Sequence, residues 1–233
     1  MGHLATVKAT PYLDRPRAGG YNIYESALMP PTPGHTVFVV DDDEAVRKAV
    51  SRLLRSAGIA AAVFASPKEF LAQYNPATPG CLLLDMAMPD LDGLQLQTAL
   101  TEKGCILPII FLTGHGDVSK SVQAMKQGAF DFLSKPVKDK DLLTAVRAAI
   151  ERDTVARREQ GKLSEIRARL DTLTPREREV LEHVVSGKLN KQIAGDMGIT
   201  EATVKMHRAH VMEKMKVQSV AELARLTERC RTS

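Results

Sequence analysis

Between residues 36 and 150, short apolar runs alternate with segments of helical periodicity, and no other feature of the chain restricts the fold as strongly. The apolar runs lie at 36–40, 61–64, 81–85, 108–112 and 129–133. Each run has the length of a strand, and the segments between them repeat apolar positions at the spacing of a helix. Five β-α units of this kind predict a parallel sheet with helices on both faces. In such sheets, functional side chains gather at the carboxyl ends of the strands.

After residue 171 the strand-like runs stop, and only helical segments follow. Four short helices are expected there, each with a residue that can cap its start: Thr174, Asn190, Thr200 and Ser219. The second and third helices, over 190–197 and 200–215, are separated by a turn at Gly198, which is the pattern of a helix-turn-helix. An all-α domain is therefore expected to follow the α/β domain.

The chain of 233 residues accordingly divides into four parts. We expect a flexible N-terminal extension over 1–35, an α/β domain over 36–150, a helical linker over 151–170 and an all-α domain over 171–233. The extension is rich in Pro and Gly, and Met29 offers a second start, so residues 1–28 can be a leader outside the folded protein.

A short apolar seam ends the linker, at Leu163, Ile166, Leu170 and Leu173. The 3-4-3 spacing of these residues places them on one helix face. That face can pack on its own domain, or it can pair two protomers as a short coiled coil. Gly161 predicts a joint in the helix just before the seam.

Composition excludes several classes of protein. Charged residues make up 26% of the chain and hydrophobic residues 44%, which is ordinary for a soluble globular protein. The net charge of +4 is too small to indicate a polyanionic partner. The three cysteines are far apart, which predicts reduced thiols in a cytoplasmic protein and not a disulfide framework. No apolar run has the length of a membrane span or the context of a signal peptide, so no membrane partner is expected.

Polar side chains follow the expected strands where each strand ends. Asp41 and Asp42 follow the first strand, Asp85 ends the third, Thr113 follows the fourth, and Lys135 comes after the fifth. In a sheet of order 2-1-3-4-5 these strands are neighbours, so the side chains meet in one pocket. Carboxylate oxygens suit Mg²⁺, which relieves the repulsion between them. Asp85 can attack a phosphorus atom, after which Lys135 and Thr113 can hold the phosphoryl oxygens.

Four motifs in this part of the chain resemble the receiver domain of two-component response regulators: VVDDDE at 39–44, LLLDMAMPDLDG at 82–93, FLTGHGD at 111–117 and FDFLSKPV at 130–137. Residues 172–226 resemble the LuxR-type helix-turn-helix output domain, through LTPREREVLEHVVSGKLNKQIAGDMGIT and EATVKMHRAHVMEKM. Together they resemble the FixJ/NarL group of transcription regulators. The resemblance implies a receiver of the CheY and flavodoxin-like fold, with a five-stranded parallel sheet, joined by a helical linker to a four-helix DNA-binding domain.

By this resemblance Asp85 is the phosphoacceptor, and a sensor histidine kinase is the donor. The metal ligands are then Asp41, Asp42, Asp85 and the backbone carbonyl of Ala87, with Asp41 acting through a water molecule. Receivers of this type catalyse their own phosphorylation and slow dephosphorylation. The role of the protein is nevertheless that of a regulator and not of an enzyme.

Thr113 and Phe132 resemble the switch pair of receivers, in which the hydroxyl turns toward the phosphoryl group and the aromatic ring turns inward. Phe132 lacks the hydroxyl of a tyrosine, so only its packing can carry the signal. Lys135 followed by Pro136 resembles the lysine and cis proline of the family.

Two rival interpretations remain. An apolar strand followed by DxDx also begins haloacid-dehalogenase phosphatases, with Asp41 as the nucleophile and Asp43 as the acid/base. Ala45 departs from that pattern, and Asp85 would have no role in it. The other rival is an atypical regulator that a ligand or a partner controls without phosphorylation.

Other residues near the pocket are assigned structural roles. Asp43 and Glu44 are expected in the first turn of a helix, where the helix dipole favours acidic residues. Met86 and Met88 are expected to border the site and shape access to it, and His115 is expected in a loop.

The second helix of the helix-turn-helix, over 200–215, is expected to enter the major groove of DNA. Its side away from the apolar face carries the candidates for contact with base edges: Lys205, Met206 and Ala209. Candidates for contact with phosphates are Thr203, Arg208, Lys191 and Lys214. The rival interpretation of these helices is a purely structural bundle.

The last helix carries one face that is expected to dimerise, made of Val220, Leu223, Ala224 and Thr227. In resembling proteins this helix pairs two output domains on a two-fold DNA site. We therefore expect promoter DNA as a partner and a homodimer that forms on phosphorylation or on DNA. RNA polymerase is a further partner that such a function allows.

Overall fold

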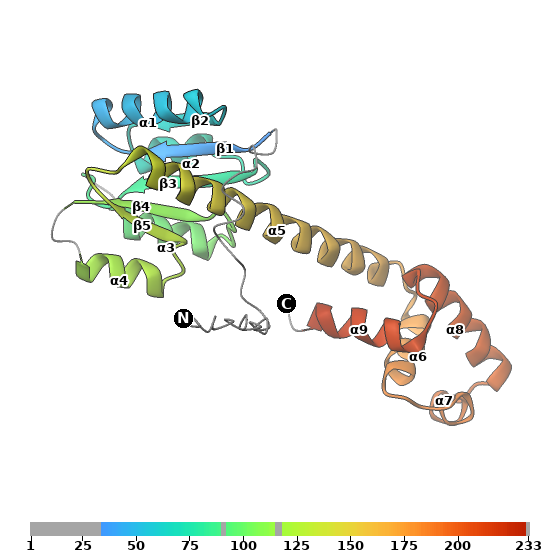
Figure 1. The fold of residues 1–233 in the computed structure, drawn as a ribbon. Coiled ribbons are helices and arrows are strands. Elements are labelled where there is room, and N and C mark those ends of the chain that lie inside the picture. Colours follow the sequence, from blue (N-terminus) through green and yellow to red (C-terminus); the bar gives the residue numbers. More distant parts are fainter. Residues whose placement is uncertain (1–33, 90–91, 115–117, 232–233) are drawn as a thin grey trace, which may run out of the picture.

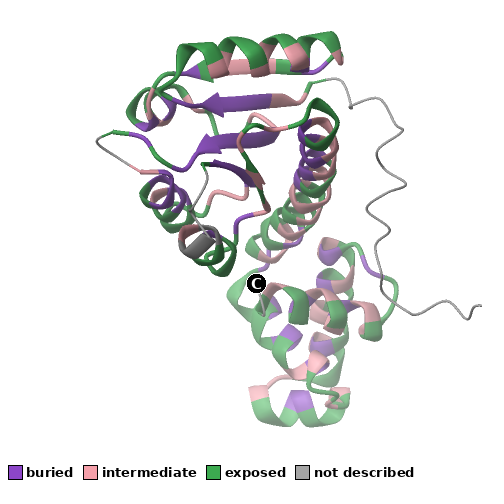
Figure 2. Cartoon of the chain, turned by 60° about the vertical axis from the view of Figure 1, so that its left-hand side comes forward, coloured by how far each residue is buried: buried purple, intermediate pink, exposed green. Residues whose placement is uncertain are grey.

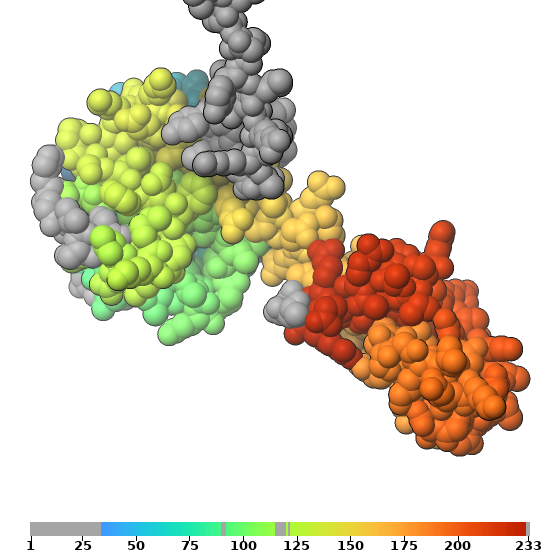
Figure 3. All heavy atoms as spheres, turned by 60° about the horizontal axis from the view of Figure 1, so that its bottom comes forward, coloured from blue at the N-terminus to red at the C-terminus, as the bar shows by residue number. Residues whose placement is uncertain are grey.

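The computed structural model describes residues 34–89, 92–114 and 118–231 (Figure 1). Of the extension expected over 1–35, only Gly34 and His35 are among the described residues. His115 also lies outside the described residues. The described residues form an α/β domain and a helical domain at the two ends of one long helix, α5 (Asp139–Asp171). The space-filling view shows this helix between the two bodies (Figure 3).

Five parallel strands form the centre of the α/β domain. They are β1 (Thr36–Val40), β2 (Ala60–Phe64), β3 (Gly80–Asp85), β4 (Ile109–Thr113) and β5 (Asp131–Ser134). Their order is β2-β1-β3-β4-β5, which confirms the predicted topology. Strands β1, β3 and β4 are buried along nearly their whole length, as the continuous apolar runs in the sequence require.

Helices cover both faces of the sheet. They are α1 (Glu44–Ser56), α2 (Pro67–Gln73), α3 (Gly93–Glu102), α4 (Val118–Lys126) and the first half of α5. Successive residues of β1 point to opposite faces: Phe38 packs in a core with α2, α3 and α4, and Val39 packs in a core with α1 and α5. Figure 2 shows the buried strands between helices whose outer sides are exposed.

Helix α5 continues without interruption through Gly161, so the predicted joint at this residue is wrong. A glycine in a helix costs only about 1 kcal/mol, and α5 is held by packing on both sides of it. On the sheet side, the buried carboxylate of Asp153 accepts hydrogen bonds from the backbone N–H of Gly80 and from Arg157 Nε, both at 2.8 Å. Arg157 also donates to the backbone carbonyls of Pro76 and Thr78. Contact with the α/β domain therefore extends beyond residue 150.

Four helices follow α5 in the described part of the chain. They are α6 (Pro175–Val185), α7 (Asn190–Met197), α8 (Glu201–Met215) and α9 (Val220–Arg231). Their core includes Ile166 and Leu173 of the linker seam, and Leu170 packs against it. Three of the four seam residues thus pack on the helical domain of their own chain in this structure, which agrees with the first of the two interpretations.

The expected caps are present at the start of α6 and α8, where Thr174 and Thr200 accept hydrogen bonds from the backbone. The expected cap at Asn190 is wrong, because α7 begins at this residue and Leu189 precedes it as the cap position. The side chain of Asn190 instead accepts a hydrogen bond from Arg208. Among the described helices, none has both the length and the apolar character needed to cross a bilayer.

Candidate functional site

Three carboxylates meet at the carboxyl end of the sheet, as the sequence predicts. The register pairs Val40 of β1 with Leu84 of β3, so Asp41 and Asp85 follow side by side on neighbouring strands. Asp41 and Asp85 are buried, Asp42 is exposed, and ligand atoms of all three lie within 4.8 Å of one another. Hard oxygen donors at this spacing form a set that a divalent cation can bind.

Lys135 enters the same pocket from the segment between β5 and α5. Its Nζ donates hydrogen bonds to Asp41 Oδ2 at 2.7 Å and to Asp85 Oδ1 at 2.8 Å. Its backbone N–H donates to the carbonyl of Thr113 at 2.7 Å, which ties the segment to β4. The peptide bond between Lys135 and Pro136 is cis, as the resemblance implies.

Asp41 is held by two further contacts. Its Oδ1 accepts a hydrogen bond from the backbone N–H of Asp43 at 2.9 Å, and its backbone carbonyl accepts one from Arg47 Nη1 at 2.7 Å. Sequence reasoning missed Arg47. The available signal was its place in the first turns of α1, directly after the acidic run.

Charge in the pocket is not balanced within the described residues that form it. Burial raises the pKa of Asp85, the ammonium of Lys135 opposes this effect, and the carboxylates of Asp41 and Asp42 add to it. Burial also works against the charge of Lys135, but its hydrogen bonds to Asp41 and Asp85 outweigh burial and raise its pKa. Lys135 thus stays an ammonium among three carboxylates, and a cation such as Mg²⁺ would relieve the remaining repulsion.

The neighbouring acidic residues have structural roles. Asp43 is the N-cap of α1, one position before the expected first turn, and its side chain accepts a hydrogen bond from the N–H of Ala45. Glu44 lies in the first turn and pairs with Lys48. The capping bond of Asp43 disfavours its use as the acid/base of a phosphatase.

Close packing fixes the backbone beyond Asp85. A Cβ atom added at Gly93 would lie 2.7 Å from the carbonyl oxygen of Asp85 and 2.8 Å from a ring carbon of Phe111, so only glycine fits there. Ala87, the expected carbonyl ligand two residues after Asp85, is exposed. Met86 and Met88 are buried in the core, so they expose almost no surface through which they could shape access to the site.

The two expected switch residues lie on neighbouring strands with different exposure. Thr113 is buried at the end of β4, and Phe132 on β5 is 44% exposed. Val122 and Met125 of α4 are also large apolar residues with 49% and 41% exposure. Strand β5 and helix α4 therefore present apolar side chains to the solvent.

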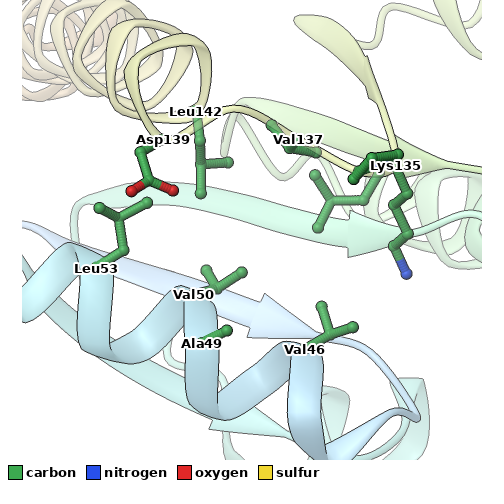
Figure 4. Close-up of a pocket in the computed structure, with 10 residues that line it drawn as sticks. Val46, Ala49, Val50, Leu53, Lys135, Val137, Asp139 and Leu142 are labelled. Carbon is green, nitrogen blue, oxygen red and sulfur yellow. The ribbon is translucent and has the colours of Figure 1, made fainter.

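A groove of about 230 Å³ lies between α1 and the start of α5. Figure 4 shows its apolar lining, with Val46, Val50 and Leu53 on the α1 side and Leu142 on the α5 side. Lys135 lies at one end of this groove, so the groove leads to the carboxylate pocket.

In the helix-turn-helix, the core side of α8 is as predicted, because Val204, Val211 and Met215 are buried. The three candidates for base-edge contact are exposed: Lys205, Met206 and Ala209. Lys191 on α7 is exposed as well. Thr203 and Arg208 are half-buried, and Arg208 Nη1 donates to Asn190 Oδ1 at 3.0 Å.

Lys214 does not fit the predicted contact with phosphate. Its Nζ donates to Glu177 Oε2 at 2.6 Å and to the backbone carbonyl of Thr172 at 3.2 Å. The ammonium is thus engaged by a nearly buried carboxylate within the protein. Spacing along α8 could not reveal this partner, because Glu177 belongs to another helix.

The face of α9 that was expected to dimerise packs largely on its own domain. Leu223 and Thr227 are buried in the described structure, and Val220 and Ala224 are half-buried. Leu223 belongs to the core that also contains Ile166 of the linker. The prediction that Leu223 and Thr227 form a dimer surface is therefore wrong for this structure.

Two families of proteins match the chain. The response regulator receiver domain matches residues 37–147, and the luxR family of bacterial regulatory proteins matches residues 171–227. Nodulation protein W of Bradyrhizobium diazoefficiens is 45% identical over 202 residues, which are 84% of this chain and 89% of that protein. The transcriptional regulatory protein FixJ of Azorhizobium caulinodans is 44% identical over 190 residues, which are 82% of this chain and 90% of that protein.

Solved structures agree with these relatives. The response regulator StyR superposes with a TM-score of 0.76 at 42% identity, over 84% of this chain and 99% of that chain. Full-length FixJ from B. japonicum superposes with a TM-score of 0.54 at 38% identity, over 87% of this chain and 100% of that chain. With a receiver sheet, a LuxR-type helix-turn-helix and such relatives along most of its length, the chain belongs to the FixJ-like two-component response regulators, which are DNA-binding transcription regulators.

Proposed function

We propose that Asp85 accepts a phosphoryl group from a sensor histidine kinase, with Mg²⁺ held by Asp41, Asp42, Asp85 and the carbonyl of Ala87. The observation that carries this proposal is the set of three carboxylates within 4.8 Å of one another, with Lys135 as their common partner. When bound, Mg²⁺ would neutralise charge on the phosphoryl oxygens as the donor approaches.

The residues of the chain divide the reaction between them. A carboxylate oxygen of Asp85 attacks phosphorus and forms the new P–O bond, while the P–N bond to the histidine of the kinase breaks and its electron pair stays on the imidazole. Lys135, which donates to Asp85 Oδ1 at 2.8 Å, can transfer this hydrogen bond to a phosphoryl oxygen. Thr113, which directly follows the register partner of Asp85 on the neighbouring strand, supplies a hydroxyl. Autophosphorylation and slow dephosphorylation at this pocket serve regulation.

The groove between α1 and α5 is the proposed docking site of the kinase. Its lining is apolar, it leads to Lys135, and a helix laid into it would carry a donor histidine to the end of the sheet where Asp85 lies.

The switch is proposed to act through Thr113 and Phe132. Movement of the Thr113 hydroxyl toward the phosphoryl group leaves room for the exposed ring of Phe132 to turn inward, which changes the apolar surface of α4 and β5. The changed surface favours a homodimer or frees the helical domain for promoter DNA. In the DNA complex, Lys205, Met206 and Ala209 face base edges, and Lys191, Thr203 and Arg208 approach phosphates.

The proposed parts are the receiver over 36–150, the linker over 151–170 and the DNA-binding domain over 171–233. Such a protein works in the cytoplasm, where it meets its kinase, its promoter and, at the promoter, RNA polymerase.

Two measurements test the phosphorylation model. Wild type incubated with a histidine kinase or a small phosphodonor and Mg²⁺ is expected to gain acid-labile phosphate, and Asp85→Asn is expected to gain none. Footprinting of promoter DNA is expected to show higher occupancy with the phosphodonor for wild type only. Phosphate found on Asp41 instead of Asp85 would support the phosphatase interpretation. Equal occupancy of the promoter DNA with and without the phosphodonor would support the atypical regulator.

A further inference from the structure

Helix α8 carries an apolar stripe on the side that faces away from the protein. Ala202, Met206 and Ala209 follow one another at i, i+4 and i+7, and all three are exposed. Val204 and Val211 point the other way and are buried. Met206 has 47% of its surface exposed, although a methionine is usually buried.

The lysines and arginine of α8 differ in whether they have a partner within the chain. Arg208 donates to Asn190 at 3.0 Å, and Lys214 donates to Glu177 at 2.6 Å. Among the lysines and arginines of α8, all of which the structure describes, Lys205 alone has no hydrogen bond or ion pair within the chain. Next to Met206, the exposed face of the helix therefore carries one cation that no other described group of the chain engages, Lys205, beside the apolar stripe.

The chemistry of the major groove limits what such a stripe can recognise. Base edges there carry hydrogen-bond donors and acceptors, and thymine alone adds a methyl group. The thioether of Met206 has no hydrogen to donate and accepts only weakly, so it gains free energy chiefly by burying apolar surface. Ala202 and Ala209 are short, which leaves Met206 as the side chain of the stripe that reaches farthest.

We propose that Met206 is a specificity-determining residue that recognises thymine by packing on its 5-methyl group. Lys205, next to it on the helix, supplies the hydrogen bonds and charge for affinity at a neighbouring base or phosphate. This inference rests on the proposed function, because it requires α8 to enter the major groove.

The test compares thymine with deoxyuridine, which lacks only the 5-methyl group. The full chain, treated with a small phosphodonor, first selects its binding sites from a pool of random DNA duplexes. Duplexes of the selected site are then made with each thymine replaced in turn by deoxyuridine. We expect one position in each half-site at which affinity falls by about 4-fold, the factor that corresponds to burying one methyl-sized group.

Variants of the protein show which side chain causes this loss of affinity for the deoxyuridine duplex. In Met206→Gln, which has similar length but a polar end, the thymine and deoxyuridine duplexes are expected to bind equally, and in Met206→Leu the preference for thymine is expected to return. Lys205→Ala is expected to weaken binding to both duplexes and to keep their ratio. Val63→Gln, at an exposed apolar residue of β2, is the matched control and is expected to keep the wild-type ratio.

Two results would overturn the proposal. If no position responds to deoxyuridine, or if Met206→Gln keeps the wild-type ratio, Met206 does not recognise thymine, while DNA binding by α8 stands. If the full chain selects no sequence at all, the proposed function fails together with the inference.

Discussion

At the scale of single residues, two nearly buried carboxylates of this chain each pair with a lysine, but the two pairs have different roles. Asp41 is paired with Lys135, and Glu177 is paired with Lys214. Asp41 shares its lysine with Asp85 and lies beside Asp42, so negative charge remains and a metal ion can bind. Glu177 has no other carboxylate at the contact in the described structure, and it accepts a hydrogen bond from the N–H of Thr174. It therefore fastens α8 to the start of α6.

The ion pair between Glu177 and Lys214 predicts a pH dependence of stability. The hydrogen bond from Lys214 and the bond from the Thr174 backbone lower the pKa of Glu177 from 4.5 to about 2. Because the folded pKa lies below the unfolded one, the contribution to stability is complete above pH 4.5 and is lost as the pH falls toward 2. We expect Glu177→Gln to lower the free energy of unfolding at neutral pH, and we expect its difference from wild type to shrink through this window.

Urea unfolding at neutral pH and at about pH 3 measures this difference. Glu179→Gln, an exposed carboxylate of the same helix, is the control and is expected to change the unfolding free energy less at both pH values. A difference between Glu177→Gln and wild type that is equal at both pH values would contradict the assignment.

At the scale of elements, α5 is one continuous helix that belongs to both domains. Its N-terminal half packs in the core of the sheet, and Ile166 packs in the core of the helical domain. The stretch that contains Gly161 joins these two parts, and a Cβ atom added at Gly161 would meet nothing within 4 Å.

We expect Gly161→Ala to raise the free energy of unfolding by about 1 kcal/mol, because alanine loses less backbone entropy in a helix than glycine. Thermal unfolding followed by circular dichroism measures the change. Gly187→Ala is a control with the opposite expected sign, since Gly187 has φ +83° and a side chain there is strained. It is expected to lower stability by about 1 kcal/mol. Destabilisation by Gly161→Ala would mean that the helix bends at this residue.

At the scale of the whole molecule, the direction of α5 sets where the helical domain lies relative to the carboxylate pocket. Only Val137 and Lys138 separate Pro136 from the start of α5, so the helix begins near the pocket and crosses the sheet to its other end. There Arg157 joins Asp153 to the segment before β3. Arg157 therefore anchors the middle of α5 to the sheet, before the helix continues into the helical domain.

We expect Arg157→Ala to lower the free energy of unfolding by about 3 kcal/mol, because it leaves the buried carboxylate of Asp153 without its cation. We also expect it to weaken the effect of the phosphodonor on DNA occupancy. Arg158→Ala removes an exposed arginine one residue away and is expected to stay within about 0.5 kcal/mol of wild type. Urea unfolding and footprinting of the two variants measure both effects, and equal behaviour of the two would exclude the anchoring role.

Local sequence patterns predicted the strands, most helix starts, the order of the sheet and the residues of the carboxylate pocket. These features follow from local patterns: continuous apolar runs make buried strands, capping residues begin helices, and strands of known order bring their ends together. The carboxylates of Asp41, Asp42 and Asp85 could be placed in one pocket because each directly follows or ends a strand.

Which apolar faces and which charges have partners within the chain became visible only in the folded protein. Leu223 and Thr227 form a periodic face in the sequence, but the chain's own core covers that face. The sequence suggests that Lys214 is a free cation, but in the structure it forms an ion pair with Glu177. The sequence also suggests a joint at Gly161, but packing at both ends of α5 keeps the helix continuous. Periodicity shows which side of a helix is apolar. The partner that covers that side, or that pairs with a charge on it, comes from a distant part of the chain and is fixed only when the whole chain packs.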